Sequence, residues 1–124
     1  MANEIKETTI LECLNGSFQM APRRVVLSNI AQAAIGSCEG TQTIGTTPEL
    51  ITLGNLTTPG MAQFTNTDAT HYVEIGLLDT GTFYPVAKLL PGEPAQFRVG
   101  SGFARLAACA NTAAVKLEKH ILET

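Results

Sequence analysis

The sequence predicts an all-β fold, organised as a single antiparallel β-sandwich of the jelly-roll or immunoglobulin-like type. Threonine, a β-branched residue that favours strands and disfavours helices, occurs 16 times among the 124 residues. A further 11 glycines and 6 prolines divide the chain into short apolar segments, which leaves little room for long amphipathic helices. The hydrophobic content of 44% is sufficient for a packed core.

The N-terminal part of the chain predicts a hairpin followed by a further strand. Glu7–Leu14 fits a strand, the dipeptide Asn15-Gly16 suits the positive φ angles of a type I′ turn, and Ser17–Met20 can return beside the first strand. Arg23–Asn29 is rich in branched apolar residues and predicts another strand. Residues 28–34 fit either a strand or a short helix, because a serine could cap such a helix and a glycine could end it.

The middle of the chain predicts short strands separated by turns that contain glycine and proline. Thr41–Ile44, Leu50–Leu53 and Met61–Thr65 are such segments. His71–Leu77 shows the clearest alternation, with a valine, an isoleucine and a leucine on one face. This segment is expected to be a core strand.

The C-terminal part continues the same pattern to the end of the chain. Phe83–Leu89 predicts a strand, and Leu90–Glu93 predicts a type II turn, with proline at its second position and glycine at its third. Ala95–Val99, Phe103–Cys109 and Ala113–Leu122 then complete the set of expected strands.

Lys119 interrupts the alternation of the last expected strand, because it shares a face with Val115, Leu117 and Ile121. An inward and unpaired ammonium would be costly. A bulge, a position on an edge strand or a contact with another subunit would each explain it.

The chain is expected to form one domain over residues 1–124. No linker, low-complexity tract or fixed-period repeat divides the sequence, and its length suits one ordinary domain. Met1–Lys6 and Leu122–Thr124 are the expected mobile ends.

Charge and hydropathy argue against several classes of partner. A net charge of −3 provides no broad basic surface, so no specific nucleic-acid binding is expected. No apolar stretch reaches the length of a membrane span, and the first residues lack the apolar core of a secretory signal. Synthesis in a cytoplasm and no membrane partner are therefore expected.

The inventory of reactive side chains is too thin for an active site. His71 and His120 lack the spacing of a local metal pair, and the three cysteines lack the paired spacing of a zinc site. Asp68 and Asp79 fall in expected turns, where a short carboxylate commonly binds local backbone N–H groups. The sequence predicts a protein that is not an enzyme and needs no cofactor or metal.

Four residues are candidates for a partner interface. Arg23 and Arg24 form a basic pair whose guanidinium groups could bind carboxylates of an acidic surface. Tyr72 could add aromatic contact area, and Lys119 could reach a neighbouring subunit. Solvated surface charge and core packing are the simpler alternatives for these positions.

Three segments carry a resemblance to a known class of proteins. Phe64–Gly76 contains the turn N-T-D-A-T followed by V-E-I-G, Phe83–Glu93 ends in a proline-glycine-glutamate hairpin, and Ala113–Glu123 is a closing strand rich in apolar residues. These segments resemble small structural proteins of tailed-bacteriophage virions. The likeness covers the second half of the chain, and the first half fits more loosely. The shared motifs are structural turns, so no catalytic residue is implied.

The resemblance implies a virion structural protein, made in the cytoplasm of a bacterial host. The first expectation is a capsid decoration or cement protein that binds and stabilises the assembled lattice of the major capsid protein. Its partners would be the major capsid protein or neighbouring virion proteins, and a homo-oligomer, preferably a trimer, would match the capsid symmetry.

Two other functions stay open at this point. The first is a head-tail connector or tail structural component, in which the same type of sandwich forms a ring. The second, from a different class, is a non-catalytic module that binds a glycan or a protein through the turns Thr57–Gly60 and Asp79–Thr82.

Overall fold

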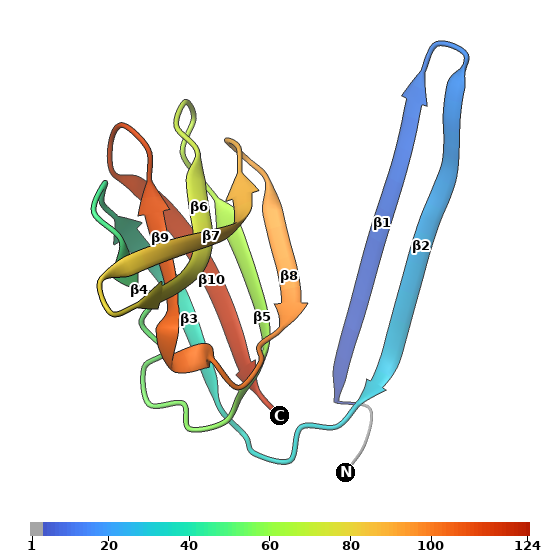
Figure 1. Ribbon diagram of the computed structural model, residues 1–124. Helices are drawn as coiled ribbons and strands as arrows, with labels where there is room; N and C mark the ends of the chain where they lie inside the picture. Colours follow the sequence, from blue (N-terminus) through green and yellow to red (C-terminus); the bar gives the residue numbers. More distant parts are fainter. Residues whose placement is uncertain (1–3) are drawn as a thin grey trace. The chain divides into compact units, whose positions relative to one another are not determined.

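The structure of the protein, a computed structural model, describes residues 4–124. The described chain consists of strands, turns and one short 3₁₀ segment, Phe103–Arg105, and this confirms the predicted all-β class. Two compact units are present: an N-terminal β-hairpin that lies before Ile35, and a sandwich over residues 35–123 (Figure 1).

The hairpin consists of β1 (Ile5–Asn15) and β2 (Phe18–Ile30), which pair in antiparallel register. The two-residue connecting turn is Gly16-Ser17, because Asn15 pairs with Phe18. Gly16 has a φ of 57°, but Asn15 does not have a positive φ, so the turn lies one residue later than predicted and is not of type I′. Strand β2 continues to Ile30 and no helix follows it, which settles residues 28–34 as a strand end and a loop.

The sandwich does not take up the first two strands, although the sequence predicted one sandwich over residues 1–124. Within the described chain β1 and β2 form a two-stranded sheet of their own, and neither belongs to one of the two larger sheets. Strand pairing depends on contacts between residues far apart in sequence, and the local alternation from which β1 and β2 were predicted contains no information about those contacts.

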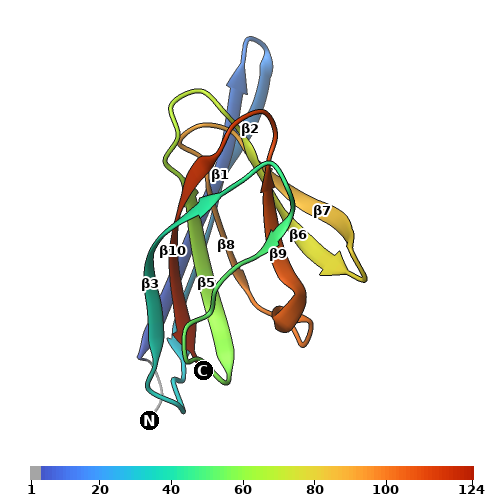
Figure 2. The ribbon, with the colours of Figure 1, turned by 90° about the vertical axis from the view of Figure 1, so that its left-hand side faces the viewer.

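Eight strands form the sandwich, in two four-stranded sheets. Their bounds are β3 (Ser37–Ile44), β4 (Glu49–Leu50), β5 (Pro59–Asn66), β6 (Val73–Asp79), β7 (Thr82–Leu89), β8 (Pro94–Arg98), β9 (Leu106–Ala110) and β10 (Val115–Glu123). The strand orders are β3-β10-β5-β8 and β4-β9-β6-β7. Figure 2 shows the two sheets as separate layers, with β3, β10 and β5 to the left of β9, β6 and β7 (Figure 2).

The strand order is that of a jelly roll, which decides between the two sandwich types left open by the sequence. The pairs are nested: β3 pairs with β10, β4 with β9, β5 with β8 and β6 with β7. Such nesting arises when one long antiparallel ribbon is rolled up, and two further pairings, β5 with β10 and β6 with β9, close the sheets.

The core of the jelly roll lies between the two sheets and is built from alternate residues of the central strands. Phe64 is fully buried and its ring lies 5.8 Å from that of Phe97. The largest other side chains with no exposed surface are Ile44, Leu117, Ile121, Val73, Val115 and Asn66. Burial of this apolar surface is the main stabilising contribution.

Parts of the two expected mobile ends, Met1–Lys6 and Leu122–Thr124, lie in strands. Residues 1–3 of Met1–Lys6 lie outside the described residues, whereas Lys6 belongs to β1. Leu122 pairs with Ser37 on one side and with Met61 on the other, so this end of β10 is held by two neighbouring strands. Apolar alternation continues through β10 almost to the end of the chain, and this keeps the strand in the sheet.

Candidate interaction surface

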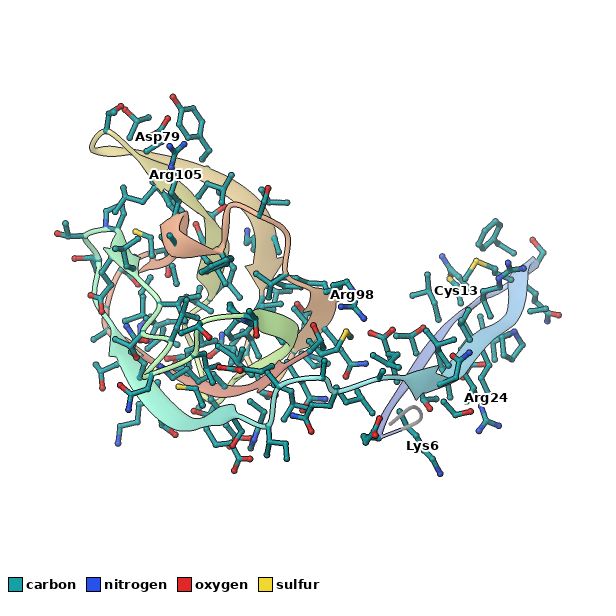
Figure 3. The ribbon with its side chains drawn as sticks, turned by 90° about the horizontal axis from the view of Figure 1, so that it is seen from below. Lys6, Cys13, Arg24, Asp79, Arg98 and Arg105 are labelled. Carbon is teal, nitrogen blue, oxygen red and sulfur yellow. The ribbon has the colours of Figure 1, made fainter. Side chains whose placement is uncertain are left out.

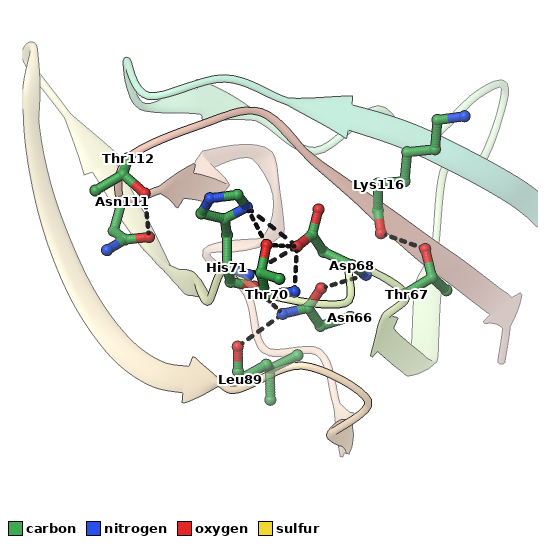
Figure 4. A network of polar contacts seen from close by, with 9 residues as sticks. All are labelled: Asn66, Thr67, Asp68, Thr70, His71, Leu89, Asn111, Thr112 and Lys116. Atoms are coloured by element: carbon green, nitrogen blue, oxygen red, sulfur yellow. Dashed lines mark hydrogen bonds and ion pairs between the residues drawn. The ribbon is translucent and has the colours of Figure 1, made fainter.

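A polar network fixes the turn between β5 and β6 (Figure 4). Asn66 is fully buried, and its side-chain nitrogen donates to the carbonyl oxygens of His71 and Leu89 at 2.9 and 3.0 Å. Its oxygen accepts from the backbone N–H of Asp68 at 2.9 Å. The Asp68 carboxylate in turn accepts from the backbone N–H groups of Thr70 and His71 at 2.8 and 2.7 Å.

The pair of Asp68 and His71 is a structural element of this turn. The backbone N–H groups of Thr70 and His71 lower the pKa of Asp68 below its ordinary value of 3.8. The imidazole Nδ1 lies 3.2 Å from the same carboxylate oxygen, which also accepts from the backbone N–H groups of Thr70 and His71 and from the Thr70 hydroxyl. No group of three or more His, Cys, Asp or Glu residues in the described chain is arranged to hold a metal ion.

Lys119 lies inside the jelly roll, with 5% of its surface exposed. Its Nζ donates to the side-chain oxygen of Gln42 at 3.3 Å and to both the carbonyl oxygen and the hydroxyl of Thr52. Gln42 comes from β3, and Thr52 comes from the segment that follows β4. Burial lowers the pKa of Lys119, because desolvation disfavours the charged amine.

The explanations offered for Lys119 on sequence grounds therefore need correction. Strand β10 lies between β3 and β5, so Lys119 is not on an edge strand. The register is regular at this point, with Gly40 and Phe64 directly opposite Lys119, so no bulge is present there. The ammonium finds its partners within the same chain, and a contact with another subunit is not needed to satisfy it.

The hairpin carries an unusual amount of exposed apolar surface. Seven of its large apolar side chains are between 44% and 74% exposed: Ile10, Leu11, Leu14, Phe18, Val25, Val26 and Leu27. Sandwiches bury one face of each sheet against a second layer. A two-stranded ribbon has no second layer of its own, and such ribbons are marginally stable in water.

Both faces of the hairpin contain apolar residues, and its arginines lie among them. Arg23 is directly opposite Leu11, and Arg24 is directly opposite Ile10. Since directly paired residues project to the same face, each arginine adds a charge to one apolar face. The candidate pair Arg23 and Arg24 is therefore placed on the hairpin, where both residues are exposed.

The other candidate partner residue, Tyr72, lies in the jelly roll just before β6. It is half-buried, and Lys88 Nζ stands 4.0 Å from the centre of its ring. The jelly roll also contains an exposed ion pair between Arg105 and Asp79, at 3.3 Å, whose side chains meet near the β6–β7 turn in Figure 3 (Figure 3). The four candidates are thus divided between the two units: two on the hairpin and two in the jelly roll.

Sequence reasoning missed the apolar surface of the hairpin, although a signal for it was present. Ile10-Leu11 and Val25-Val26-Leu27 place apolar side chains on both faces of one ribbon. A strand that packs on a single core face alternates apolar and polar residues instead. Adjacent apolar residues in a two-stranded ribbon indicate contacts on both sides.

An apolar groove opens between the two sheets along the β7 and β8 side of the jelly roll. Its volume is about 500 Å³. The lining includes Leu77, Val86, Phe97, Val99 and Phe103, with Arg98 as the charged residue. On the opposite side of the sandwich, the Gln42 side chain of β3 hydrogen-bonds to Glu49 and Leu50 of β4.

No family model, curated protein or solved structure matches this chain. Within residues 4–124 there is also no helix that is long and apolar enough to cross a membrane.

Proposed function

We propose that the protein is a structural protein of a bacteriophage virion, a capsid decoration or cement protein that docks on the assembled major capsid lattice through its β1–β2 hairpin. The proposal combines the sequence resemblance with the exposed apolar surface of the hairpin. Jelly rolls occur in viral capsid proteins and also in lectins, so the fold alone does not select the function.

The observation that carries the proposal is the hairpin's surface. The seven exposed side chains together offer an area on the order of the ~800 Å² that each partner contributes to a standard interface. Solvent exposure of this much apolar surface on a thin ribbon is unfavourable, and contact with another protein would remove it from water. The jelly roll has a hydrophobic core of its own.

Arg23 and Arg24 would add an electrostatic contribution to the same contact. Guanidinium groups bind carboxylates in bidentate geometry, and at the edge of an apolar interface they favour an acidic partner surface. The association would then weaken as salt concentration rises.

Stabilisation would follow from mass action. A protein that binds only the assembled, expanded lattice lowers the free energy of that state. The stabilisation grows with the logarithm of one plus the ratio of the free protein concentration to its dissociation constant. Cyclic clusters such as trimers would place equivalent hairpins at equivalent lattice positions.

The test is co-sedimentation of the purified protein with expanded heads assembled from the major capsid protein of the same phage. We expect saturable binding that Leu11→Asp on the hairpin weakens by at least about 100-fold, because an apolar side chain that the contact would bury becomes a charge. Ile35→Asp is the matched control, since Ile35 is 96% exposed and lies outside the hairpin. Equal binding by both variants would contradict the assignment of the hairpin as the segment that contacts the capsid.

The groove between β7 and β8 favours a second candidate, a head-tail connector or tail component. A chain that carries both an apolar hairpin and an apolar groove could associate head to tail, and such contacts close into rings. Light scattering across a dilution series separates the candidates. A trimer favours decoration and a ring of six or more favours a connector, whereas a monomer that binds glycans saturably favours the binding module.

A further inference from the structure

The polar cluster inside the jelly roll contains the parts of a self-processing site. It consists of Gln42 from β3, Glu49 from β4, Thr52 from the segment after β4, and Lys119 from β10. We propose that Lys119 and Gln42 form an intramolecular isopeptide bond with release of ammonia, assisted by Glu49 and Thr52. This inference does not depend on the proposed function.

Lys119 supplies the nucleophile. Its Nζ lies 3.3 Å from Gln42 Oε1, and the fully buried Phe64 is directly opposite it on β5. An amine is nucleophilic only when neutral, and burial lowers the pKa of Lys119, so its neutral form is more accessible than that of an exposed lysine.

Thr52 stabilises the charge that develops on the carboxamide oxygen. The side-chain oxygen of Gln42 accepts from the backbone N–H of Thr52 at 2.9 Å and from its hydroxyl at 3.1 Å. Attack on Cδ moves negative charge to this oxygen, which already faces both donors. The arrangement is therefore an oxyanion site built before the reaction.

Glu49 is placed at the leaving group. Gln42 Nε2 donates to Glu49 Oε1 at 3.4 Å and to the carbonyl oxygen of Leu50 at 3.0 Å. A carboxylate in this position can take up the proton released by the attacking amine and pass it to the departing nitrogen, which cannot leave as an amide anion.

The covalent step is a transamidation. Neutral Lys119 Nζ attacks Gln42 Cδ and forms a C–N bond, the Cδ–Nε2 bond breaks, and Nε2 leaves as ammonia. One proton moves in net terms from Nζ to Nε2, with the Thr52 hydroxyl in contact with Nζ and Glu49 in contact with Nε2. A primary amide and an amine become a secondary amide and ammonia, so no oxidant or other reactant is needed.

The bond would join the first and last strands of the jelly roll, β3 and β10. These strands already pair along their length, and a covalent link between them would close a loop that contains nearly all of the sandwich. A cross-link of this kind restricts the unfolded chain and resists separation of the ends under load.

Intact-mass spectrometry of the purified full chain, incubated folded in mildly alkaline buffer, tests the proposal. We expect a mass lower than that of the sequence by one ammonia, and a digest containing a cross-linked peptide pair that joins Gln42 to Lys119. A folded wild-type protein whose mass stays equal to that of its sequence would overturn the proposal.

Variants identify the source of any ammonia loss. Lys119→Met should abolish it, Glu49→Gln should slow it by about 100-fold or more, and Lys116→Met, at an exposed position of the same strand, should leave it unchanged. Cyclisation of the backbone at Asn15-Gly16 would also release one ammonia, but that loss would persist in Lys119→Met. Persistence of the full loss in that variant would therefore refute the cross-link.

Discussion

Replacing Asn66 with alanine is expected to lower the free energy of unfolding of the jelly roll by about 3 kcal/mol. The side chain is fully buried and makes three hydrogen bonds of 2.9 to 3.0 Å, to His71, Leu89 and Asp68. Each buried group left without a partner costs roughly 1–3 kcal/mol. The bond to Leu89 is buried and should cost most, whereas the other two are partly exposed and water can replace part of them.

Urea unfolding followed by far-ultraviolet circular dichroism measures this change, since the chain contains no tryptophan. Asn111→Ala is the matched control, because Asn111 is exposed in the turn before β10, and we expect a change within about 0.5 kcal/mol. Asn66→Asp keeps the shape of the side chain but turns its donor into an acceptor that faces the carbonyl oxygen of Leu89. It should therefore destabilise at least as much as alanine.

A destabilisation by Asn66→Ala no larger than that of Asn111→Ala would refute the reasoning. It would mean that the carbonyl groups of His71 and Leu89 find other partners without cost. A mild effect of Asn66→Asp would lead to the same conclusion, since its carboxylate could then be tolerated beside a carbonyl oxygen.

Three further predictions follow from local geometry. A Cβ at Gly76 would overlap the backbone of Tyr84 and Pro85, so Gly76→Ala should cost about 3 kcal/mol in thermal unfolding, and a loss below about 0.5 kcal/mol would contradict the close approach. Because the pKa of Asp68 is lower in the folded state, the contribution of this carboxylate to stability is present above the unfolded pKa of 3.8 and is lost as pH falls through the folded pKa. The Asp68→Asn variant should therefore lose less stability between neutral and acid pH than the wild type in urea unfolding. An equal loss in both proteins would contradict a stabilising role of the carboxylate. Burial raises the pKa of the Cys109 thiol, so its alkylation at mildly alkaline pH, followed by peptide mass spectrometry, should be slower than that of a free cysteine, and an equal rate would disprove the effect.

Local features of the fold could be predicted because short-range patterns determine them. The two-residue turn that begins at Gly16, the proline-glycine turn before Glu93 and the apolar alternation of Val73 and Ile75 appear in the structure at or next to their expected positions, although Leu77, expected on the same face, is 40% exposed. Each depends on residues within a few positions of one another, through backbone φ preferences or through the two-residue period of a strand.

The candidate site was less predictable. Arg23 and Arg24 were identified from their charge, but their apolar neighbours on the hairpin, such as Leu11 and Phe18, were assigned to a sandwich. Lys119 was identified correctly as an exception to the alternation, and its partners Gln42 and Thr52 were not. Those partners lie 77 and 67 residues away in sequence, beyond the reach of any local pattern.

By itself the sequence determined the class of structure: strands of a given length, turns at given dipeptides, and which residues of each strand share a face. The tertiary structure alone decided which strands pair, and so it separated β1 and β2 as a hairpin, ordered the other eight strands as a jelly roll, and enclosed Lys119 among neutral oxygen acceptors. The physical reason is that strand alternation specifies a face to be buried without specifying the surface that buries it. That surface is supplied by segments distant in sequence, through contacts that form only when the whole chain folds.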